Sequence, residues 1–398
     1  MQRPTQAVIL AGGRGSRLRP LTDTRPKPMI EFHGKPFLGY LLELLREQGF
    51  ERVLLLLGYL PEVIQDYCGD GRAWGLEIDC SVSAVEDDTG RRLKLAQPKI
   101  DPRFLFMYCD NYWPLSFDLM WKRYLACGGS GMLTIYRNDD RYTKDNVEMG
   151  EDGAIVRYDK DRTAPELRGV DIGFGIFERG VLDLMFEGNV SFEREVYPAL
   201  AARRALFAYR TSHRYYSVSS HERLPATAQF LARQPAVILD RDGVLNKKPP
   251  RAEYVRSWDE WEWLPGALES LHLLHEAGYH VLVVSNQAGI ARGAMTEADL
   301  AAIHRRFLQE VGEAGGRVDA IYHCPHGWDE GCECRKPKPG MLHRAQREWH
   351  LDLSRTWFIG DDERDSQAAE AAGCPGVLVS DQRSLLDVTR HLLEHAYV

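Results

Sequence analysis

An apolar run leads directly into two carboxylates in Val237-Ile238-Leu239-Asp240-Arg241-Asp242-Gly243-Val244-Leu245-Asn246. The apolar part predicts a buried parallel strand, and a glycine-containing turn follows it. Open α/β sheets place their ligands at the carboxyl ends of such strands. Two carboxylates there can bind Mg²⁺ through oxygen, while one attacks phosphorus and the other handles the proton. An ordinary Asp-rich turn is the alternative, and this stretch alone does not separate the two.

Polar side chains also follow two later predicted strands, and a basic pair lies between them. These groups are Ser285, Asn286 and Gln287 after His280–Val284, Arg335 and Lys336, and Asp361 and Asp365 after Trp357–Ile359. Hydroxyl and amide groups can hold phosphate oxygens, and a cation neutralises a transferring phosphoryl group. Each group has an ordinary structural explanation alone, but their combination with Asp240 and Asp242 predicts a phosphoryl-transfer site.

This set resembles the motifs of the haloacid dehalogenase (HAD) phosphatases, which form an aspartyl-phosphate. The resemblance implies that Asp240 is the nucleophile and that Asp242 is the general acid and base. It also implies that Ser285 and Lys336 bind the phosphate group.

The same resemblance implies a Mg²⁺ site. Asp240, Asp242 and Asp361 would bind the ion, and Asp365 would orient its ligands. The loop Gly289–Gly293 is expected to contact the substrate. The further substrate contacts expected in this half of the chain are Asn286, Gln287, Arg292 and Arg335.

Three cysteines and a histidine form a dense group at Cys324, His326, Cys332 and Cys334. The pattern Cys-x-His-x5-Cys-x-Cys suits tetrahedral Zn²⁺. Buried free thiols with an incidental histidine are the alternative, but the segment is too polar for a core. Because the four side chains leave no position for water, the zinc is expected to be structural. Lys336 follows closely, so zinc binding would position the phosphate-binding cation.

The zinc segment narrows the resemblance to one branch of the HAD phosphatases. Together with the stretch around Asp240 and the loop Ser285–Gly293, it resembles D-glycero-D-manno-heptose-1,7-bisphosphate 7-phosphatases over nearly all of residues 236–398. Histidinol-phosphatases share this zinc segment, so histidinol phosphate or another sugar phosphate is the alternative substrate.

A glycine-rich loop follows the first predicted strand, Ala7–Leu10, near the amino terminus. The loop is Ala11-Gly12-Gly13-Arg14-Gly15-Ser16-Arg17-Leu18. Its backbone N–H groups can approach a triphosphate closely. It is not a Walker A motif, and it lacks the Gly-x-Gly-x-x-Gly spacing. With Lys27 in Pro26-Lys27-Pro28-Met29, the loop resembles the signature of sugar-1-phosphate nucleotidylyltransferases.

That resemblance implies specific roles in the first half of the chain. Arg17 and Lys27 would be catalytic, and Asp110, after the predicted strand Phe104–Tyr108, would bind Mg²⁺ and substrate. An aspartate at a strand end can also be a simple helix cap or turn former. Nucleotide contacts are expected from Ala11, Gly12, Gly13, Arg14, Gly15, Ser16, Thr89 and Gly90, and sugar-phosphate and sugar contacts from Lys160 and Asp171.

One loop and one single position depart from the pattern of that family. Relatives usually carry Gly-Thr-Gly-Gly-Ala-Leu in the base-binding loop, where this chain has Asp88–Leu93. They also carry a second metal-binding aspartate where this chain has Ser217. Since a hydroxyl is a poorer Mg²⁺ ligand than a carboxylate, the metal site and the base specificity are less defined here.

The two resemblances together predict a bifunctional enzyme that makes a nucleotide-activated heptose. A phosphatase acting on a heptose bisphosphate yields the heptose 1-phosphate that a nucleotidylyltransferase needs. GTP is the expected nucleotide, with ATP as the alternative. A different hypothesis makes the first domain a binding module that senses a nucleotide sugar and regulates the phosphatase.

The length of 398 residues suggests two or three domains. We expect an α/β protein of two Rossmann-like three-layer domains. Residues 1–233 would form a nucleotidyltransferase fold, and residues 234–398 a HAD fold with a zinc-bound loop. The linker is short, so the two domains are expected to pack near each other.

The composition excludes some classes of binding partner. A net charge of −8 argues against a nucleic-acid or anionic membrane surface. The longest apolar run, Val53–Leu57, cannot span a bilayer, and no signal-peptide pattern is present. We therefore expect a cytoplasmic protein with nucleotide and sugar phosphate substrates. The oligomeric state stays open, and a homo-oligomer is compatible with the sequence.

Overall fold

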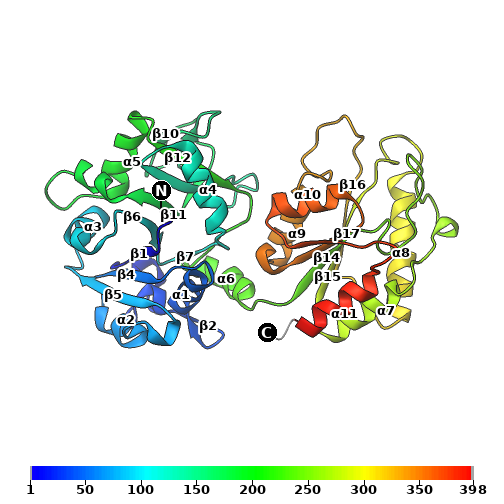
Figure 1. Cartoon of the computed structure of the whole chain (residues 1–398), viewed down its shortest axis with the longest axis horizontal. Coiled ribbons are helices and arrows are strands. Elements are labelled where there is room, and N and C mark those ends of the chain that lie inside the picture. Colours follow the sequence, from blue (N-terminus) through cyan, green and yellow to red (C-terminus); the bar gives the residue numbers. More distant parts are fainter. Residues whose placement is uncertain (1, 396–398) are drawn as a thin grey trace. The chain divides into compact units, whose positions relative to one another are not determined.

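Two β-sheets, one in each half of the chain, organise the structure (Figure 1). The computed structural model describes residues 2–395 and divides into two units, Met1–Ala232 and Arg233–Val398. Each unit is described by itself.

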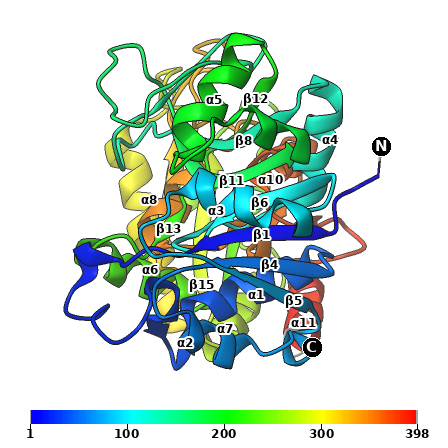
Figure 2. The same ribbon diagram turned by 90° about the vertical axis from the view of Figure 1, so that its left-hand side faces the viewer.

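The first sheet has the strand order β12-β8-β11-β6-β1-β4-β5, which Figure 2 shows from top to bottom. Its strands are β1 (Gln6–Ala11), β4 (Arg52–Leu57), β5 (Glu77–Val82), β6 (Arg103–Tyr108), β8 (Gly131–Tyr136), β11 (Val170–Glu178) and β12 (Leu206–Thr211). The pairs along β6, β1, β4 and β5 are parallel, whereas β11 is antiparallel to both neighbours. The ends of β1, β4, β5 and β6 therefore meet at one edge, where open sheets bind ligands.

Helices cover both faces of this sheet because its central strands are apolar on both sides. In β1, Ala7 and Ile9 pack into one core, and Val8 and Leu10 pack into the other. Helices α1, α2, α4 and α6 contribute to the first core, and α3 and α5 contribute to the second. Their bounds are α1 (Phe37–Glu47), α2 (Pro61–Cys68), α3 (Thr89–Ala96), α4 (Phe117–Cys127), α5 (Phe192–Ala202) and α6 (Leu224–Leu231).

Three short strand pairs flank the first sheet. They are β2 (Glu31–Phe32) with β3 (Lys35–Pro36), β7 (Asn111–Tyr112) with β13 (Tyr216–Ser217), and β9 (Val147–Met149) with β10 (Ile155–Tyr158). Strand β10 ends at Tyr158, so Lys160 lies in the turn that follows.

The second sheet is entirely parallel, in the order β16-β15-β14-β17-β18. Its strands are β14 (Ala236–Leu239), β15 (His280–Asn286), β16 (Ala320–Cys324), β17 (Trp357–Gly360) and β18 (Gly376–Leu378). Its helices are α7 (Ala267–Glu276), α8 (Glu297–Glu313), α9 (Gly340–Trp349), α10 (Glu363–Ala372) and α11 (Leu385–His395). Ile238 packs with α9 and α10, and Leu239 packs with α7, α8 and α11. Both units are three-layer α/β structures, so the predicted fold class is confirmed.

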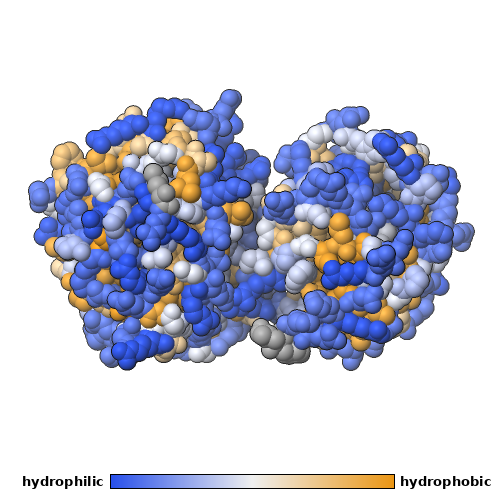
Figure 3. All heavy atoms as spheres, viewed as in Figure 1, coloured by the Kyte–Doolittle hydropathy of each residue, from blue (hydrophilic) through white to orange (hydrophobic). Residues whose placement is uncertain are grey.

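The surface is largely hydrophilic on the face that Figure 3 presents, with apolar residues in separate patches. Within residues 2–395, every helix is too short or too polar to cross a bilayer.

Candidate functional sites

The turn after β14 places two aspartates in different surroundings. Asp240 continues the strand ladder through its N–H, which donates to the Ile359 carbonyl at 2.9 Å. Gly243 has a φ of 97°, and a Cβ there would lie 2.2 Å from an Asp361 carboxylate oxygen. A glycine is therefore required for the turn and for the approach of Asp361 to it.

Asp240, Asp361 and Asp365 form a carboxylate cluster at the ends of β14 and β17. One oxygen from each lies within 4.8 Å of the others. Lys336 Nζ contacts Asp240 Oδ1 at 2.8 Å and Asp365 Oδ1 at 2.7 Å. Asp361 Oδ1 is buried and has no hydrogen-bond partner among the described residues. An oxygen-rich cluster with an unpartnered carboxylate oxygen fits a Mg²⁺ ion.

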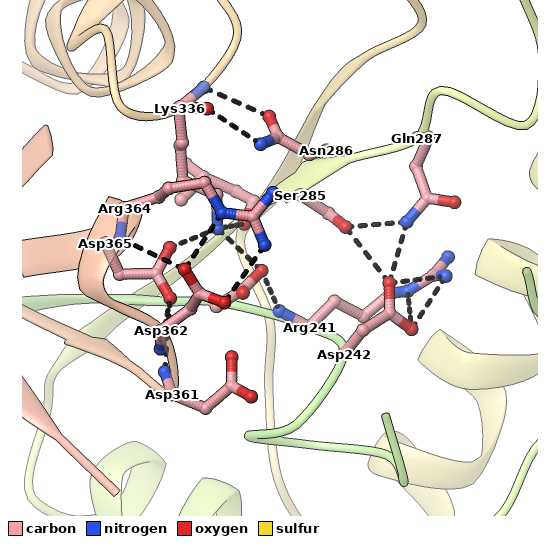
Figure 4. Close-up of polar contacts among 12 residues, drawn as sticks. Arg241, Asp242, Ser285, Asn286, Gln287, Lys336, Asp361, Asp362, Arg364 and Asp365 are labelled. Carbon is pink, nitrogen blue, oxygen red and sulfur yellow. Dashed lines mark hydrogen bonds and ion pairs between the residues drawn. The ribbon is translucent and has the colours of Figure 1, made fainter. Parts of the chain in front are cut away.

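The local structure of α10 explains how Asp365 reaches this cluster. Asp362 is the N-cap of the helix, and Asp365 closes a capping box with it. Asp365 Oδ2 accepts the backbone N–H groups of Asp361 and Asp362, each at 3.1 Å. Its other oxygen is left to meet Lys336 (Figure 4).

Burial and like charge set the protonation of the cluster. Burial raises the pKa of Asp240 to about 7, and Asp365 adds to this effect while Lys336 opposes it. Burial lowers the pKa of Lys336, but its two carboxylate neighbours outweigh this and hold its pKa above the ordinary value. Burial also raises the pKa of Asp361. A divalent cation would relieve this accumulation of buried negative charge.

The carboxylate of Asp242 lies apart from the Asp240–Asp361–Asp365 cluster. It accepts hydrogen bonds from Arg241 at 2.9 Å, from Asn246 at 2.9 Å and from Gln287 at 2.9 Å. Figure 4 shows it turned toward Arg241 and Gln287. Burial raises the pKa of Asp242, but Arg241 and these hydrogen bonds outweigh burial and lower it. The sequence analysis predicted Asp242 as a Mg²⁺ ligand together with Asp240 and Asp361. In the structure, the third carboxylate of that cluster belongs to Asp365.

The residues at the carboxyl end of β15 hold Lys336 in place. The Asn286 amide donates to the Lys336 carbonyl at 3.1 Å and accepts the Lys336 N–H at 3.1 Å. Ser285 is buried, and its Oγ accepts a hydrogen bond from Gln287 at 2.7 Å. Lys336 therefore lies beside Asp240, and Ser285 lies beside Asp242, with its Oγ 3.5 Å from Asp242 Oδ2.

The four predicted zinc ligands converge. Cys324 Sγ lies 3.6 Å from Cys332 Sγ and 3.5 Å from His326 Nδ1. Cys334 Sγ lies 3.6 Å from Cys332 Sγ and 3.3 Å from His326 Nδ1. Sulfur ligands around tetrahedral Zn²⁺, with Zn–S bonds of about 2.3 Å, lie about 3.8 Å apart. The spacing therefore fits zinc.

In the first unit, the glycine-rich loop follows β1 directly. Gly15 adopts a left-handed conformation with φ 65°, and its carbonyl accepts the Thr22 hydroxyl at 3.0 Å. Arg17 lies in the 3₁₀ helix Ser16–Leu18 that follows the loop. Arg14 pairs with exposed Glu86 at 2.8 Å.

Lys27 and Asp110 form an ion pair at the carboxyl end of β6, with a distance of 2.9 Å. Burial lowers the pKa of Lys27, but Asp110 outweighs it and raises the pKa, while nearby Arg17 opposes that rise. Asp110 offers one carboxylate to a metal, so a Mg²⁺ ion there would take further ligands from bound phosphate groups.

Ser217 lies beside the predicted metal ligand. It pairs with Asn111 across β13 and β7, and the Val218 N–H donates to the Asp110 carbonyl at 2.8 Å. The Ser217 hydroxyl is 2.8 Å from that of Ser219. The position where the family resemblance predicts an acid thus holds a hydroxyl within hydrogen-bond distance of a second hydroxyl.

A buried carboxylate that sequence reasoning did not single out connects two predicted binding residues. Glu193 accepts hydrogen bonds from Thr89 at 2.8 Å and from Lys160 at 3.0 Å, and it also contacts Tyr108 and Ser191. Its signal in the sequence was an acid on the apolar face of α5.

Asp171 lies close to this group. Burial raises the pKa of Asp171 to about 7, although a hydrogen bond from the Gly173 N–H at 2.9 Å opposes the shift. The Glu193 carboxylate raises the pKa of Asp171 further, so the two acids are close enough to repel each other. Lys160 and Asp171, the predicted sugar-binding pair, thus lie in one acidic region.

Comparison with known proteins relates both units to described families. A nucleotidyl transferase family model matches residues 6–196, and a HAD-hydrolase-like family model matches residues 333–393. D-glycero-beta-D-manno-heptose-1,7-bisphosphate 7-phosphatase of Pseudomonas aeruginosa is 44% identical over 158 residues, which are 40% of this chain and 88% of that protein. The chain belongs to this phosphatase family. It joins a HAD-like phosphatase domain to an amino-terminal nucleotidyl transferase domain.

One further relative and one solved structure are similar to parts of this chain. The heptose-bisphosphate phosphatase of Pseudomonas putida is 46% identical over 143 residues, covering 36% of this chain and 81% of that protein. The solved structure of HddC from Yersinia pseudotuberculosis matches 57% of this chain and 100% of its own, with a TM-score of 0.50 and 22% identity. That likeness concerns the fold.

In this phosphatase family member, a cavity of about 420 Å³ opens beside Lys336. It is lined by cations from three segments, and the lining contains no carboxylate. The cations are Arg251, Arg335, Lys336, Lys338 and Arg364. Trp328 also lines it, with the guanidinium of Arg292 3.8 Å from its ring centroid. Of these residues, the sequence singled out Arg292, Arg335 and Lys336, because only these lie in or beside recognised motifs.

Proposed function

We propose that the chain is a bifunctional enzyme of nucleotide-activated heptose synthesis. The second unit would remove the 7-phosphate of D-glycero-D-manno-heptose 1,7-bisphosphate, and the first would transfer a nucleotidyl group to the resulting heptose 1-phosphate. The observation that carries this proposal is the Asp240–Asp361–Asp365 cluster with Lys336, beside a cavity lined only by cations among its charged residues.

In the phosphatase reaction, a carboxylate oxygen of Asp240 attacks the 7-phosphorus. The bond from phosphorus to the sugar oxygen breaks, and an aspartyl-phosphate forms. Asp242 gives a proton to the leaving oxygen and then takes one from the water that hydrolyses the intermediate. The approaching phosphate dianion would raise the lowered pKa of Asp242 and so favour its protonation. Lys336 and Ser285 neutralise and hold the phosphoryl oxygens.

Asp240 and Asp361, with Asp365 beside them, are the residues that would hold Mg²⁺. Bound there, the ion would supply charge neutralisation for the phosphoryl group. Zn²⁺ at Cys324, His326, Cys332 and Cys334 would be structural, because four protein ligands complete its coordination.

The cation-lined cavity supports a bisphosphate rather than a monophosphate substrate. A phosphate group that does not react still carries about two negative charges, and burial without cations would be costly. Arg251 and Arg335 can meet that charge while Asp240 attacks the other phosphate, whereas Lys338 and Arg364 are already paired with Glu333 and Asp362.

In the transferase reaction, an oxygen of heptose 1-phosphate attacks the α-phosphorus of the nucleoside triphosphate, and pyrophosphate leaves. Arg17, Lys27 and the N–H groups of the glycine-rich loop would neutralise the developing charge. Asp110 would hold Mg²⁺ together with the triphosphate. GTP is the proposed nucleotide, and ATP is the alternative.

Ser217 favours a second candidate function for the first unit. Without the second acid, this unit could bind a nucleotide sugar and regulate the phosphatase without catalysing transfer. The full-length protein with heptose 1,7-bisphosphate, Mg²⁺ and each nucleoside triphosphate distinguishes the two. Release of phosphate and pyrophosphate with a nucleotide heptose detected by mass spectrometry supports transfer. Phosphate release alone, altered by added nucleotide sugar, supports the regulatory function.

A further inference from the structure

Arg92, on α3, is a buried cation beneath the glycine-rich loop. Its residue is 5% exposed, and both terminal nitrogens of its guanidinium are saturated with acceptors. The hydrogen bonds run from Nη1 to Leu57 O at 2.8 Å and Ser83 Oγ at 2.9 Å, and from Nη2 to Ala84 O at 2.9 Å, Val85 O at 3.1 Å and Gly12 O at 3.4 Å.

The backbone leaves space for this guanidinium at two glycines. A Cβ at Gly12 would lie 2.4 Å from Arg92 Cζ, and a Cβ at Gly58 would lie 2.5 Å from Arg92 Nη1. Any larger residue at either position would displace the guanidinium or the backbone. The Gly12 and Gly58 backbones therefore both lie close against this guanidinium.

The acceptors belong to three separate segments at the carboxyl edge of the first sheet. Gly12 is in the glycine-rich loop after β1, Leu57 ends β4, and Ser83–Val85 follow β5. This edge is where an open sheet binds its ligand. A planar guanidinium with fixed donors holds several carbonyls at defined relative positions, which a flexible ammonium cannot do.

We infer that Arg92 is a positioning residue of the nucleotide site: it ties the glycine-rich loop to the Ser83–Val85 segment and so fixes two walls of that site relative to each other. The inference rests on the proposed nucleotide binding of the first unit. It gives the departure at Asp88–Leu93 a role, because the arginine that replaces a small residue there supplies the connection.

Arg92→Gln in the full-length protein tests this, with Arg203→Gln as its control. Arg203 is an exposed arginine at the carboxyl end of α5, outside the predicted nucleotide-binding residues. We expect Arg92→Gln to raise the KM for the nucleoside triphosphate about tenfold or more, with the KM for heptose 1-phosphate changed less than about twofold. Phosphatase activity, which belongs to the other unit, should stay at the wild-type level.

Two variants separate positioning from general destabilisation. Arg92→Lys keeps the positive charge but loses the planar guanidinium with its fixed N–H donors. Its nucleotide affinity should therefore lie between those of Arg92→Gln and the wild type. Gly58→Ala displaces the guanidinium without changing it and should raise the same KM. Equal nucleotide KM values for Arg92→Gln and Arg203→Gln would overturn the inference. So would an equal rise in both substrate KM values together with a lower Tm.

Calorimetric titration with GTP and ATP tests the inference independently of catalysis. A wild-type protein that binds nucleotide without releasing pyrophosphate would refute the proposed transfer. Weaker nucleotide binding by Arg92→Gln would still support the positioning role. A wild-type protein that binds neither nucleotide would overturn this inference.

Discussion

The carboxylates of the two sites are held in different ways. In the second unit, Asp240 is buried against two further carboxylates and a lysine that is 3% exposed. In the first unit, Asp110 makes one ion pair with Lys27, and the adjacent position holds Ser217. The phosphatase site thus has its charges assembled before any ligand arrives, whereas the transferase site needs charges that its substrates bring. Loss of one group should therefore be more damaging in the second unit.

The most damaging change should be Asp240→Asn. It removes the nucleophile, so phosphate release from heptose 1,7-bisphosphate should fall by about 10⁴-fold or more. Transfer from heptose 1-phosphate should stay near the wild-type rate, because the two sites belong to separate units. Colorimetric phosphate and pyrophosphate assays measure both, with exposed Asp381→Asn as the control. Loss of both activities in a folded protein would contradict the two-site proposal.

The same variant tests the order of the two reactions. Asp171 and Glu193 make the predicted sugar region acidic, so a second phosphate there should be repelled. Given heptose 1,7-bisphosphate, nucleoside triphosphate and Mg²⁺, Asp240→Asn should make almost no nucleotide sugar. Lys27→Ala protein keeps its phosphatase site and can convert the bisphosphate to heptose 1-phosphate. Adding it should raise the yield of nucleotide sugar only if this heptose 1-phosphate binds the intact transferase site of the Asp240→Asn protein. Mass spectrometric detection of a nucleotide-linked heptose 7-phosphate would show that the order is wrong.

Lys27→Ala should lower the transfer rate by about 100-fold, because a cation beside the reacting phosphates contributes several kcal/mol. The transfer rate is measured as pyrophosphate release at saturating substrate concentrations, for the variant and for the wild type. Lys122→Ala, an exposed lysine on α4, is the matched control. Normal release by Lys27→Ala would mean that the signature does not support catalysis in this chain.

Cys332→Ser should reduce phosphatase activity about tenfold by loosening the segment that carries Lys336. Elemental analysis should find one zinc per chain in the wild type and less in the variant. Cys127→Ser, outside the cluster, should retain both metal and activity. A metal-free protein with full phosphatase activity would refute the structural role.

The smallest effect concerns stability and pH. The pKa of Asp171 is raised to about 7 in the folded protein, so its ionisation costs stability as pH rises from its ordinary value, 3.8, toward 7. Below 3.8 the cost is absent. Asp171→Asn should therefore raise the Tm of the first unit at pH 8, on the order of 5 °C, and have little effect near pH 4. Calorimetric scans at both pH values measure this, and an equal shift at both would contradict the assignment.

The sequence predicted the elements that follow from local patterns. Apolar strands followed by Asp240 and Asp110 predicted that both aspartates lie at the carboxyl edge of a parallel sheet, and the structure places them there. The spacing of Cys324, His326, Cys332 and Cys334 predicted a cluster that the structure forms.

What could not be predicted depends on side-chain direction and on contacts between distant segments. The turn of Asp242 toward Arg241 is a choice of rotamer, and the sequence pattern does not encode it. The cavity combines Arg251 with Lys338 and Arg364, which are far apart in the chain and lie outside the strand-end pattern. Arg92 looked like a departure from a motif, and its role follows only from the carbonyls around it.

Asp365 does two things with one carboxylate: it caps α10 and holds Lys336. Selection for a stable helix therefore also preserves part of the reaction site. A descendant that had lost its substrate would keep this aspartate for as long as it kept the helix end. The persistence of this motif in a lineage is therefore weaker evidence for retained activity than the persistence of Lys336, whose ammonium group lies between the carboxylates of Asp240 and Asp365.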